Sequence, residues 1–122
     1  FVLLISEDGA NLKARTSPIA FTASGKIWVN NHAHILKFKE KATHKLVEIY
    51  INKIDISEYI TGQAQPKLNQ QNLNNIKIPL PPLPEQQKIV SEIEKIEAKI
   101  NSLEIKIASI PKEKEAVLKK YL

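Results

Sequence analysis

The chain has 122 residues, a formal net charge of +5 and no cysteine, which excludes disulfides and thiolate chemistry. Its length suits one domain or one domain with an extension, and the apolar opening run FVLLI is too short to span a bilayer. The lack of cysteine is compatible with the cytoplasm, where we expect the protein to act. Because the sequence contains no methionine, we also expect it to be a fragment of a longer protein.

The positive charge is concentrated in the first two thirds of the chain. Residues 1–84 carry ten basic and six acidic side chains, a net charge of +4, whereas residues 85–122 carry eight lysines and seven acids, a net charge of +1. A basic surface favours nucleic-acid binding. A lysine-rich surface that serves solubility alone explains the excess equally well.

Short strands are predicted first along the chain. The run FVLLIS at residues 1–6 is typical of a buried strand, and EDGAN at residues 7–11 of a turn. IAFTA at residues 19–23 predicts a second strand that Ser24-Gly25 turns into KIWV as a hairpin, after a loop NLKARTS at residues 11–17. AHILKFK at residues 33–39 alternates with a period of two, which predicts a further strand.

Helical spacing begins at Thr43, a candidate N-cap for a helix that carries Leu46, Val47, Tyr50 and Ile54 on one face. After the loop TGQAQPKLN, Asn69 is expected to cap a short helical turn in QQNLNN before IKIPLP returns to extended chain. Strands and one clear helix, followed by a long helix, predict an α+β fold.

Aliphatic residues then recur at alternating spacings of four and three, which is an unbroken heptad repeat. We call this set the seam: Ile89, Ile93, Ile96, Ile100, Leu103, Ile107 and Ile110. Such regularity favours a partner helix, and isoleucine at the d positions disfavours a simple parallel dimer, so an antiparallel pair or a larger bundle is expected. Pro84 is predicted at the first helical position, and Pro111 is predicted to end or kink the helix at Ile110 before a second short helix.

Two motifs precede and open this long helix. Gln-Pro-x-Leu-Asn stands at residues 65–69, and Ile-Pro-x-Pro-Pro-x-x-Glu-Gln stands at residues 78–86. With GKIWVNNHAHIL at residues 25–36 and the heptad helix, they closely resemble the end of a target recognition domain in the specificity subunit of type I restriction–modification systems. The resemblance covers most of the chain.

This resemblance implies the C-terminal part of a DNA target recognition domain over residues 1–84 and a conserved coiled-coil spacer helix over residues 85–122, kinked near residue 111. The first part would read one half of a bipartite site in double-stranded DNA. The helix would pair antiparallel with an equivalent helix in the same chain or in a second copy. The subunit would have no catalysis of its own and would direct a methyltransferase (modification) subunit and a restriction subunit.

Polar side chains on the loops are the candidate DNA contacts: Lys13, Arg15, Thr16, Ser17, Lys26, Asn30, Asn31, His32, Gln63, Gln65 and Lys67. Arginine can bond guanine in a bidentate manner, asparagine or glutamine can bond adenine, and lysine can meet phosphate. Arg15, the only arginine, can instead form a surface ion pair with Glu7 or Asp8. The paired asparagines can simply form a turn, and the loop at residues 61–69 can simply brace the domain.

We expect no catalytic residue, metal or cofactor. The three glycines are isolated, no Asn/Asp-Pro-Pro-aromatic motif of an amino-methyltransferase is present, and Glu7 and Asp8 lie in a turn without a nearby Glu-x-Lys pattern. His32 and His34 could bind a metal with His44, but there is no cysteine or nearby acid to complete the site, so packing or DNA contact is the favoured role.

Two alternatives stay open. The chain can be the recognition domain of a fused methylase–nuclease, or a coiled-coil protein-interaction module in which the helix is the functional part. Antiparallel pairing of two identical helices would bring the e-position acids Glu97 and Glu104 near each other, which mildly favours a non-identical partner.

Overall fold

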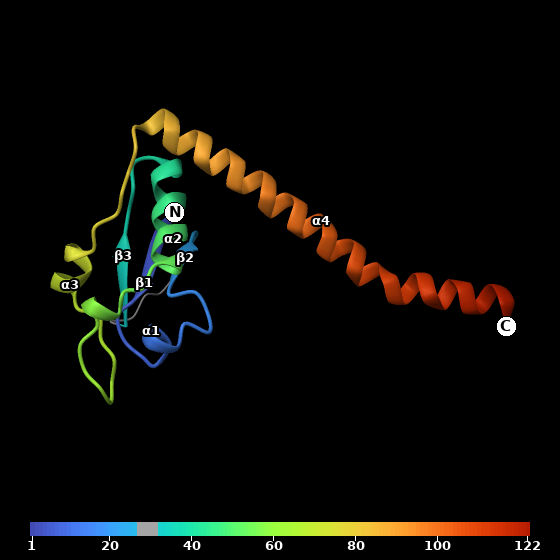
Figure 1. Ribbon diagram of the computed structural model, residues 1–122, viewed down its shortest axis with the longest axis horizontal. Coiled ribbons are helices and arrows are strands. Elements are labelled where there is room, and N and C mark those ends of the chain that lie inside the picture. Colours follow the sequence, from blue (N-terminus) through green and yellow to red (C-terminus); the bar gives the residue numbers. More distant parts are fainter. Residues whose placement is uncertain (27–31) are drawn as a thin grey trace. The chain divides into compact units, whose positions relative to one another are not determined.

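The computed structural model describes residues 1–26 and 32–122. The elements are β1 (Val2–Ser6), α1 (Asn11–Ala14), β2 (Ala20–Ala23), β3 (Ala33–Leu36), α2 (Lys41–Lys53), the 3-10 helix η1 (Ser57–Tyr59), α3 (Gln70–Asn75) and α4 (Leu83–Tyr121) (Figure 1). They form two compact units, Phe1–Gln86 and Gln87–Leu122. The predicted α+β class is confirmed.

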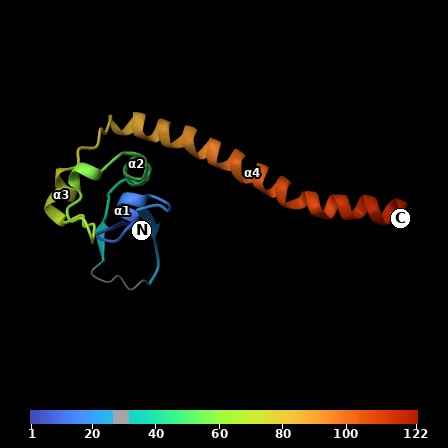
Figure 2. The same ribbon diagram turned by 60° about the horizontal axis from the view of Figure 1, so that its bottom comes forward.

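The first unit is built on a three-stranded antiparallel sheet with the order β2-β1-β3. Leu4 of the central strand faces Phe21 on one side and Ile35 on the other. Because side chains alternate along a strand, Leu3 and Ile5 point to the opposite face, where α2 packs (Figure 2). The three predicted strands are confirmed, whereas the predicted hairpin into KIWV falls on residues 27–29, outside the described residues.

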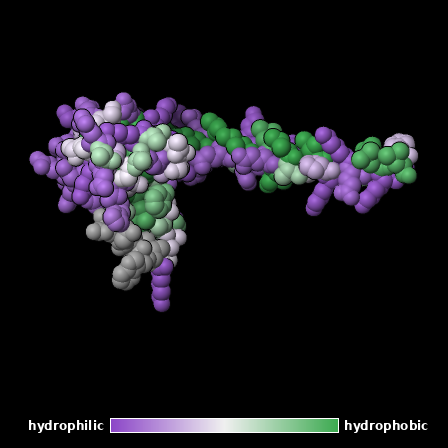
Figure 3. Space-filling view, turned by 90° about the horizontal axis from the view of Figure 1, so that it is seen from below, coloured by the Kyte–Doolittle hydropathy of each residue, from purple (hydrophilic) through white to green (hydrophobic). Residues whose placement is uncertain are grey.

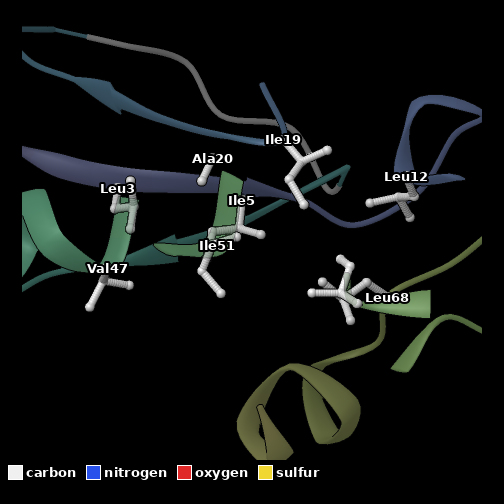
Figure 4. Packing of buried hydrophobic residues seen from close by; sticks show 9 residues of the cluster. Leu3, Ile5, Leu12, Ile19, Ala20, Val47, Ile51 and Leu68 are labelled. Carbon is white, nitrogen blue, oxygen red and sulfur yellow. The ribbon is translucent and has the colours of Figure 1, made fainter. Parts of the chain in front are cut away.

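The core lies between the sheet and the helices that cover one of its faces (Figure 4). Its members come from every part of the unit: Leu3, Ile5, Leu12, Ile19, Ala20, Val47, Ile51, Ile56 and Leu68. Burying one large aliphatic side chain contributes roughly 1.5–3 kcal/mol, so this cluster is the main source of stability for the unit. Leu12 and Leu68 belong to this cluster, so the core extends beneath the segments after β1 and before α3.

The predicted helix is confirmed as α2, but its predicted N-cap is wrong. Glu40 stands at the cap position, and no side chain caps the helix there. Thr43 lies within the first turn instead, and its hydroxyl donates to Oε1 of Gln86 at 2.6 Å. The hydroxyl is therefore used in a tertiary contact that links α2 to the start of α4.

Of the two short helices, α3 was predicted from the sequence and α1 was not. Asn69 caps α3 as predicted, because its side-chain oxygen accepts from the backbone N–H of Asn72 at 2.8 Å. Residues 11–17 were expected to be a loop throughout, but their first four residues form the single turn of α1. Leu12 on that turn is fully buried, and this burial explains why a turn forms there.

Helix α4 begins close to its prediction and ends well beyond it. Backbone N–H groups of Glu85 and Gln86 donate to the carbonyl of Pro82, so Leu83 is the first helical residue and Pro84 the second. Pro111 was predicted to end or kink the helix, and of these outcomes the end with a second short helix is wrong, because α4 continues through Pro111 to Tyr121. Proline removes one hydrogen bond of the helix, and the axis of α4 bends in its C-terminal third without breaking (Figure 1).

The seam of α4 is largely accessible to solvent. Apart from Ile93, which is half-buried, its residues are exposed, from 37% for Ile89 to 65% for Ile107. Figure 3 shows apolar side chains recurring along this helix among polar ones. An amphipathic helix of 39 residues, roughly 58 Å long, therefore presents an exposed aliphatic stripe.

Candidate functional site

Three segments that are distant in sequence meet at the carboxyl end of β1. We call them the loop cluster: residues 7–17, His32 and residues 61–68. The backbone N–H of Glu7 donates to the carbonyl of His32 at 2.9 Å, and the carbonyl of Glu7 accepts from the N–H of Leu68 at 2.6 Å. The N–H of Gly9 donates to the carbonyl of Pro66 at 3.1 Å. Backbone pairing thus brings the predicted DNA-binding loops together.

Asn11 organises the segment that follows β1. Its side-chain oxygen accepts from the N–H of Thr16 at 2.9 Å, from the hydroxyl of Thr16 at 3.1 Å and from the N–H of Ser17 at 3.2 Å. Its amide nitrogen donates to the carbonyl of Ser17 at 2.9 Å. One side chain therefore holds both predicted contact residues, which remain exposed at the surface.

Arg15 directs its guanidinium at the carboxyl end of α2. The group donates to the carbonyls of Ile54 at 3.0 Å, Ile51 at 2.9 Å and Asn52 at 2.8 Å. The residue adopts a left-handed φ of 54°, which is uncommon outside glycine and aims the side chain back toward the helix. Sequence analysis weighed a base contact against a surface ion pair, and the structure shows a third use of the side chain.

The second loop, at residues 61–67, is closed by a pair of backbone hydrogen bonds. Thr61 and Lys67 donate to each other's carbonyls at 2.9 and 2.8 Å. Gly62 has φ +84°, and a Cβ there would lie against the carbonyl oxygen of Gln65, closer than van der Waals contact allows. Gln63 and Gln65 are exposed at the tip. The turn therefore presents two amides to solvent from a constrained backbone.

Polar and charged side chains of the loop cluster contact one another and the nearby backbone. Nζ of Lys13 donates to the carbonyl of Gly62 at 3.3 Å, and Nζ of Lys67 lies 3.6 Å from a carboxylate oxygen of Glu7. Nδ1 of His32 lies 2.7 Å from a carboxylate oxygen of Asp8. Both lysines and the histidine are exposed, so these contacts contribute little to stability.

The histidines do not converge on one point. His34 donates from Nε2 to the carbonyl of Leu68 at 2.6 Å, and His44 bonds the hydroxyl of Thr22 at 2.8 Å. Within the part of the chain that the structure describes, no three His, Asp or Glu side chains gather as metal ligands do. Lys26 is exposed after β2, and Asn30 and Asn31 lie outside the described residues.

The two sequence motifs have clear structural roles. In Gln-Pro-x-Leu-Asn, Pro66 is buried, Leu68 is in the core and Asn69 caps α3. In the proline-rich motif, the amide of Gln86 donates to the carbonyl of Pro81 at 2.7 Å while it accepts from Thr43. These residues fix the two ends of the segment between the second loop and α4.

Asn52 is a structural residue that sequence reasoning missed. Its side-chain oxygen accepts from the N–H groups of Ile19 and Ala20 at 3.0 and 2.9 Å, and its nitrogen donates to the carbonyl of Ala20 at 2.8 Å. The side chain thus extends the sheet's hydrogen bonding to the end of α2. The sequence offered one signal for this role. Asparagine has a poor helix propensity, yet Asn52 stands within the predicted helix beside the buried Ile51.

Comparison with known proteins gives the family. A family model described as the type I restriction modification DNA specificity domain matches residues 3–112. The chain belongs to this family. The resemblance predicted from the two motifs is confirmed, and the match covers the first unit from residue 3 and the second unit as far as residue 112.

A relative in Haemophilus influenzae supports the assignment. The specificity domain is 31% identical over 96 residues to a protein named there as a candidate type I restriction enzyme specificity subunit. The alignment covers 79% of this chain and 24% of the relative, so the chain spans about a quarter of that protein. No solved structure matches the specificity domain. Among residues 1–26 and 32–122, no helix has the length and apolar character needed to cross a membrane.

Proposed function

We propose that this specificity domain reads one half of a bipartite site in double-stranded DNA and directs a methyltransferase subunit and a restriction subunit to it. The match of residues 3–112 to the DNA specificity family carries the proposal. In this role the chain selects the sequence and catalyses no step itself, and it acts in the cytoplasm. The loop cluster supports the proposal because it gathers exposed hydrogen-bonding side chains at one edge of a packed unit.

Within the loop cluster, different residues receive different tasks. Gln63 and Gln65 stand at a constrained tip, and amide side chains can bond adenine in a bidentate manner. Lys13 and Lys67 are suited to phosphate contacts, which position the protein without specifying sequence. Arg15 acts through its neighbours, because its guanidinium already bonds two carbonyls of α2 and the carbonyl of Ile54 just after it.

Other exposed residues form the rim of this proposed interface. Thr16 and Ser17 are held by Asn11, and His32 lies beside Asp8. The proposed contact set also includes the exposed Lys26, which follows β2, together with Asn30 and Asn31, which lie outside the described residues.

The test uses the full-length protein with its methyltransferase subunit, after the target has been read from the methylation pattern of the host genome. Replacing Gln63 and Gln65 together by alanine should reduce the preference for the target over a one-base variant by roughly 10-fold or more. Lys67→Ala should weaken binding to all duplexes alike and reduce the salt dependence by about one phosphate contact. Gln87→Ala, an exposed amide on α4, is the matched control. Absence of any duplex preference, or an unchanged preference in the double variant, would refute the proposal.

The second part of the proposal concerns α4. We infer that it pairs antiparallel with an equivalent helix, in the same chain or in a second copy, and so sets the distance between two recognition domains. Its support is the seam, which leaves six large aliphatic side chains exposed. Replacing Ile96 and Ile100 by lysine should abolish assembly, whereas Ile105→Lys, which changes an exposed isoleucine on the opposite side of α4, should leave assembly intact.

The exposed seam also favours a second candidate function, a protein-interaction module in which DNA contact has no role. Under that alternative, the seam variants abolish partner assembly while the loop variants Gln63→Ala and Lys67→Ala change nothing. Loss of DNA selectivity in the loop variants with assembly intact decides for the specificity function.

A further inference from the structure

The heptad pattern of α4 does not stop at Pro111. Because the helix is continuous to Tyr121, the residues after the proline keep their place on the seam face. Lys114 takes the next a position, Val117 the next d position and Tyr121 the a position after that. Val117 and Tyr121 are 58% and 73% exposed. The face available for pairing is therefore longer than the predicted seam, and it contains one lysine.

We propose that α4 pairs with a second copy of this chain in one antiparallel register centred on Ile105, and that charged residues flanking the seam select it. The inference rests on the proposed pairing of α4. In this register, a and d residues equidistant from Ile105 face each other, so Leu103 meets Ile107 and Ile100 meets Ile110 of the second copy. Ile93 meets Val117 in the same way. Every one of these layers is aliphatic on both sides.

The charges beside the seam complement each other in this register. At the g positions, Glu92 lies opposite Lys120 of the second copy, and Lys99 lies opposite Glu113. The symmetry of the pair repeats each contact, which makes four attractive contacts. The unfavourable contacts are confined to the symmetry axis, where Lys106 meets its own copy.

The neighbouring registers are less favourable. Sliding the helices one heptad toward the start of α4 places Glu92 opposite Glu113 and Lys99 opposite Lys106, so attractive contacts become repulsive ones. Sliding them one heptad the other way places Lys99 opposite Lys120, which cancels the attraction between Lys106 and Glu113. A parallel pair is also disfavoured, because it places Lys114 against Lys114 inside the seam. A single lysine at an a position specifies pairing at a cost in stability. In the proposed antiparallel register, Lys114 faces Ile96 of the second copy.

Two identical copies are therefore compatible with the charges at the e positions. Sequence reasoning expected repulsion between Glu97 and Glu104, but that expectation treated the helix as ending at Ile110. With α4 continuous, Glu97 lies beside Pro111 of the second copy, and only Glu104 meets its equivalent at the axis. One glutamate pair is outweighed by the four attractive g-position contacts.

The chain contains no cysteine, so introduced thiols can report the register directly. Chains carrying Glu92→Cys and Lys120→Cys, mixed in equal amounts and treated with a short bismaleimide, should give a covalent dimer. The matched control is Glu92→Cys mixed with Glu113→Cys, which reports the register shifted by one heptad and should give little product. Preferential linking in the control mixture, or dimers of Glu92→Cys alone, would overturn the register.

A charge swap provides the second test, with the dimer dissociation constant measured by sedimentation. Glu92→Lys and Lys120→Glu should each weaken the dimer, roughly twofold to fivefold, because each makes two contacts repulsive. The double variant should return to the value of the unchanged chain, and a double variant weaker than either single one would overturn the inference. If the unchanged chain does not dimerise at all, this inference fails, whereas duplex selectivity measured separately still decides the DNA function.

Discussion

The guanidinium of Arg15 donates to the carbonyl oxygen of Asn52 at 2.8 Å, across 37 residues of sequence. The carbonyls of Ile51 and Ile54 accept from the same group. The last carbonyls of a helix have no partners within it and carry the negative end of the helix dipole. The chain's only arginine therefore joins the segment after β1 to the end of α2 and fixes the shape of the loop cluster.

Replacing Arg15 by alanine should lower the free energy of unfolding by about 2–3 kcal/mol, because hydrogen bonds from a charged donor are lost and partly buried carbonyls are left unpaired. Arg15→Lys should restore only part of the loss, since an ammonium group cannot match the planar fork of a guanidinium. Urea denaturation measures both effects. Lys13→Ala, at an exposed position on the same loop, should change stability by less than about 0.5 kcal/mol. Unchanged stability of Arg15→Ala together with lost duplex selectivity would instead assign the side chain to direct DNA contact.

Gly62→Ala should destabilise the unit by about 1–3 kcal/mol and disturb the tip that carries Gln63 and Gln65. The φ of +84° disfavours any residue with a Cβ, and the added atom would also collide with the carbonyl oxygen of Gln65. Gly25→Ala separates the two effects, because its φ is +79° but a Cβ there meets nothing within 4 Å. Thermal unfolding of both variants is the measurement. Equal losses would show that the backbone conformation alone matters at residue 62.

Thr43→Val should cost about 1–3 kcal/mol, because it leaves the oxygen of the buried Gln86 side chain without its hydrogen-bond donor. Gln86→Leu removes the acceptor, and it should cost less in combination with Thr43→Val, where both partners are gone, than in the presence of Thr43. A double-mutant cycle by chemical denaturation gives the coupling energy. Gln87→Leu changes an exposed neighbour of the same type and should be nearly neutral. Simple additivity of the two changes would contradict a direct contact.

The pKa of Asp55 lies below its ordinary value of 3.8 because the Ser57 hydroxyl donates to the carboxylate at 2.6 Å. The Ser57 N–H at 2.9 Å and the charge of Arg15 lower it further. Because the pKa of Asp55 is lower in the folded chain than in the unfolded chain, its ionised carboxylate stabilises the folded state. This stabilisation is complete at a pH above the unfolded-state pKa and is lost as the pH falls through the folded-state pKa.

Asp55→Asn should therefore be less stable than the unchanged chain at neutral pH, with a difference that shrinks once the pH falls below about 4. Urea denaturation at a series of pH values measures this, and Ser57→Ala should reduce the same pH dependence because it removes the largest cause of the shift. A difference that stays constant with pH would contradict the assigned hydrogen bonds.

The sequence alone was sufficient wherever a repeating pattern or a local rule decides the structure. An apolar run predicted β1, alternation predicted β3, helical spacing predicted α2, and the heptad repeat predicted most of α4, because burial imposes such patterns on any sequence. The cap of α3 by Asn69 depends on residues only three positions apart, and the two motifs identified the family before any fold was described.

Only the tertiary structure assigned the polar side chains their partners. Arg15, Asn52 and Thr43 bond groups more than thirty residues away, and no sequence spacing indicates which carbonyl or amide will lie beside them. Whether α4 ends or continues at Pro111 was also left open by the sequence, and the structure shows that it continues. Periodic burial is a property of the chain itself, whereas the choice of hydrogen-bond partners follows from packing that brings distant segments together.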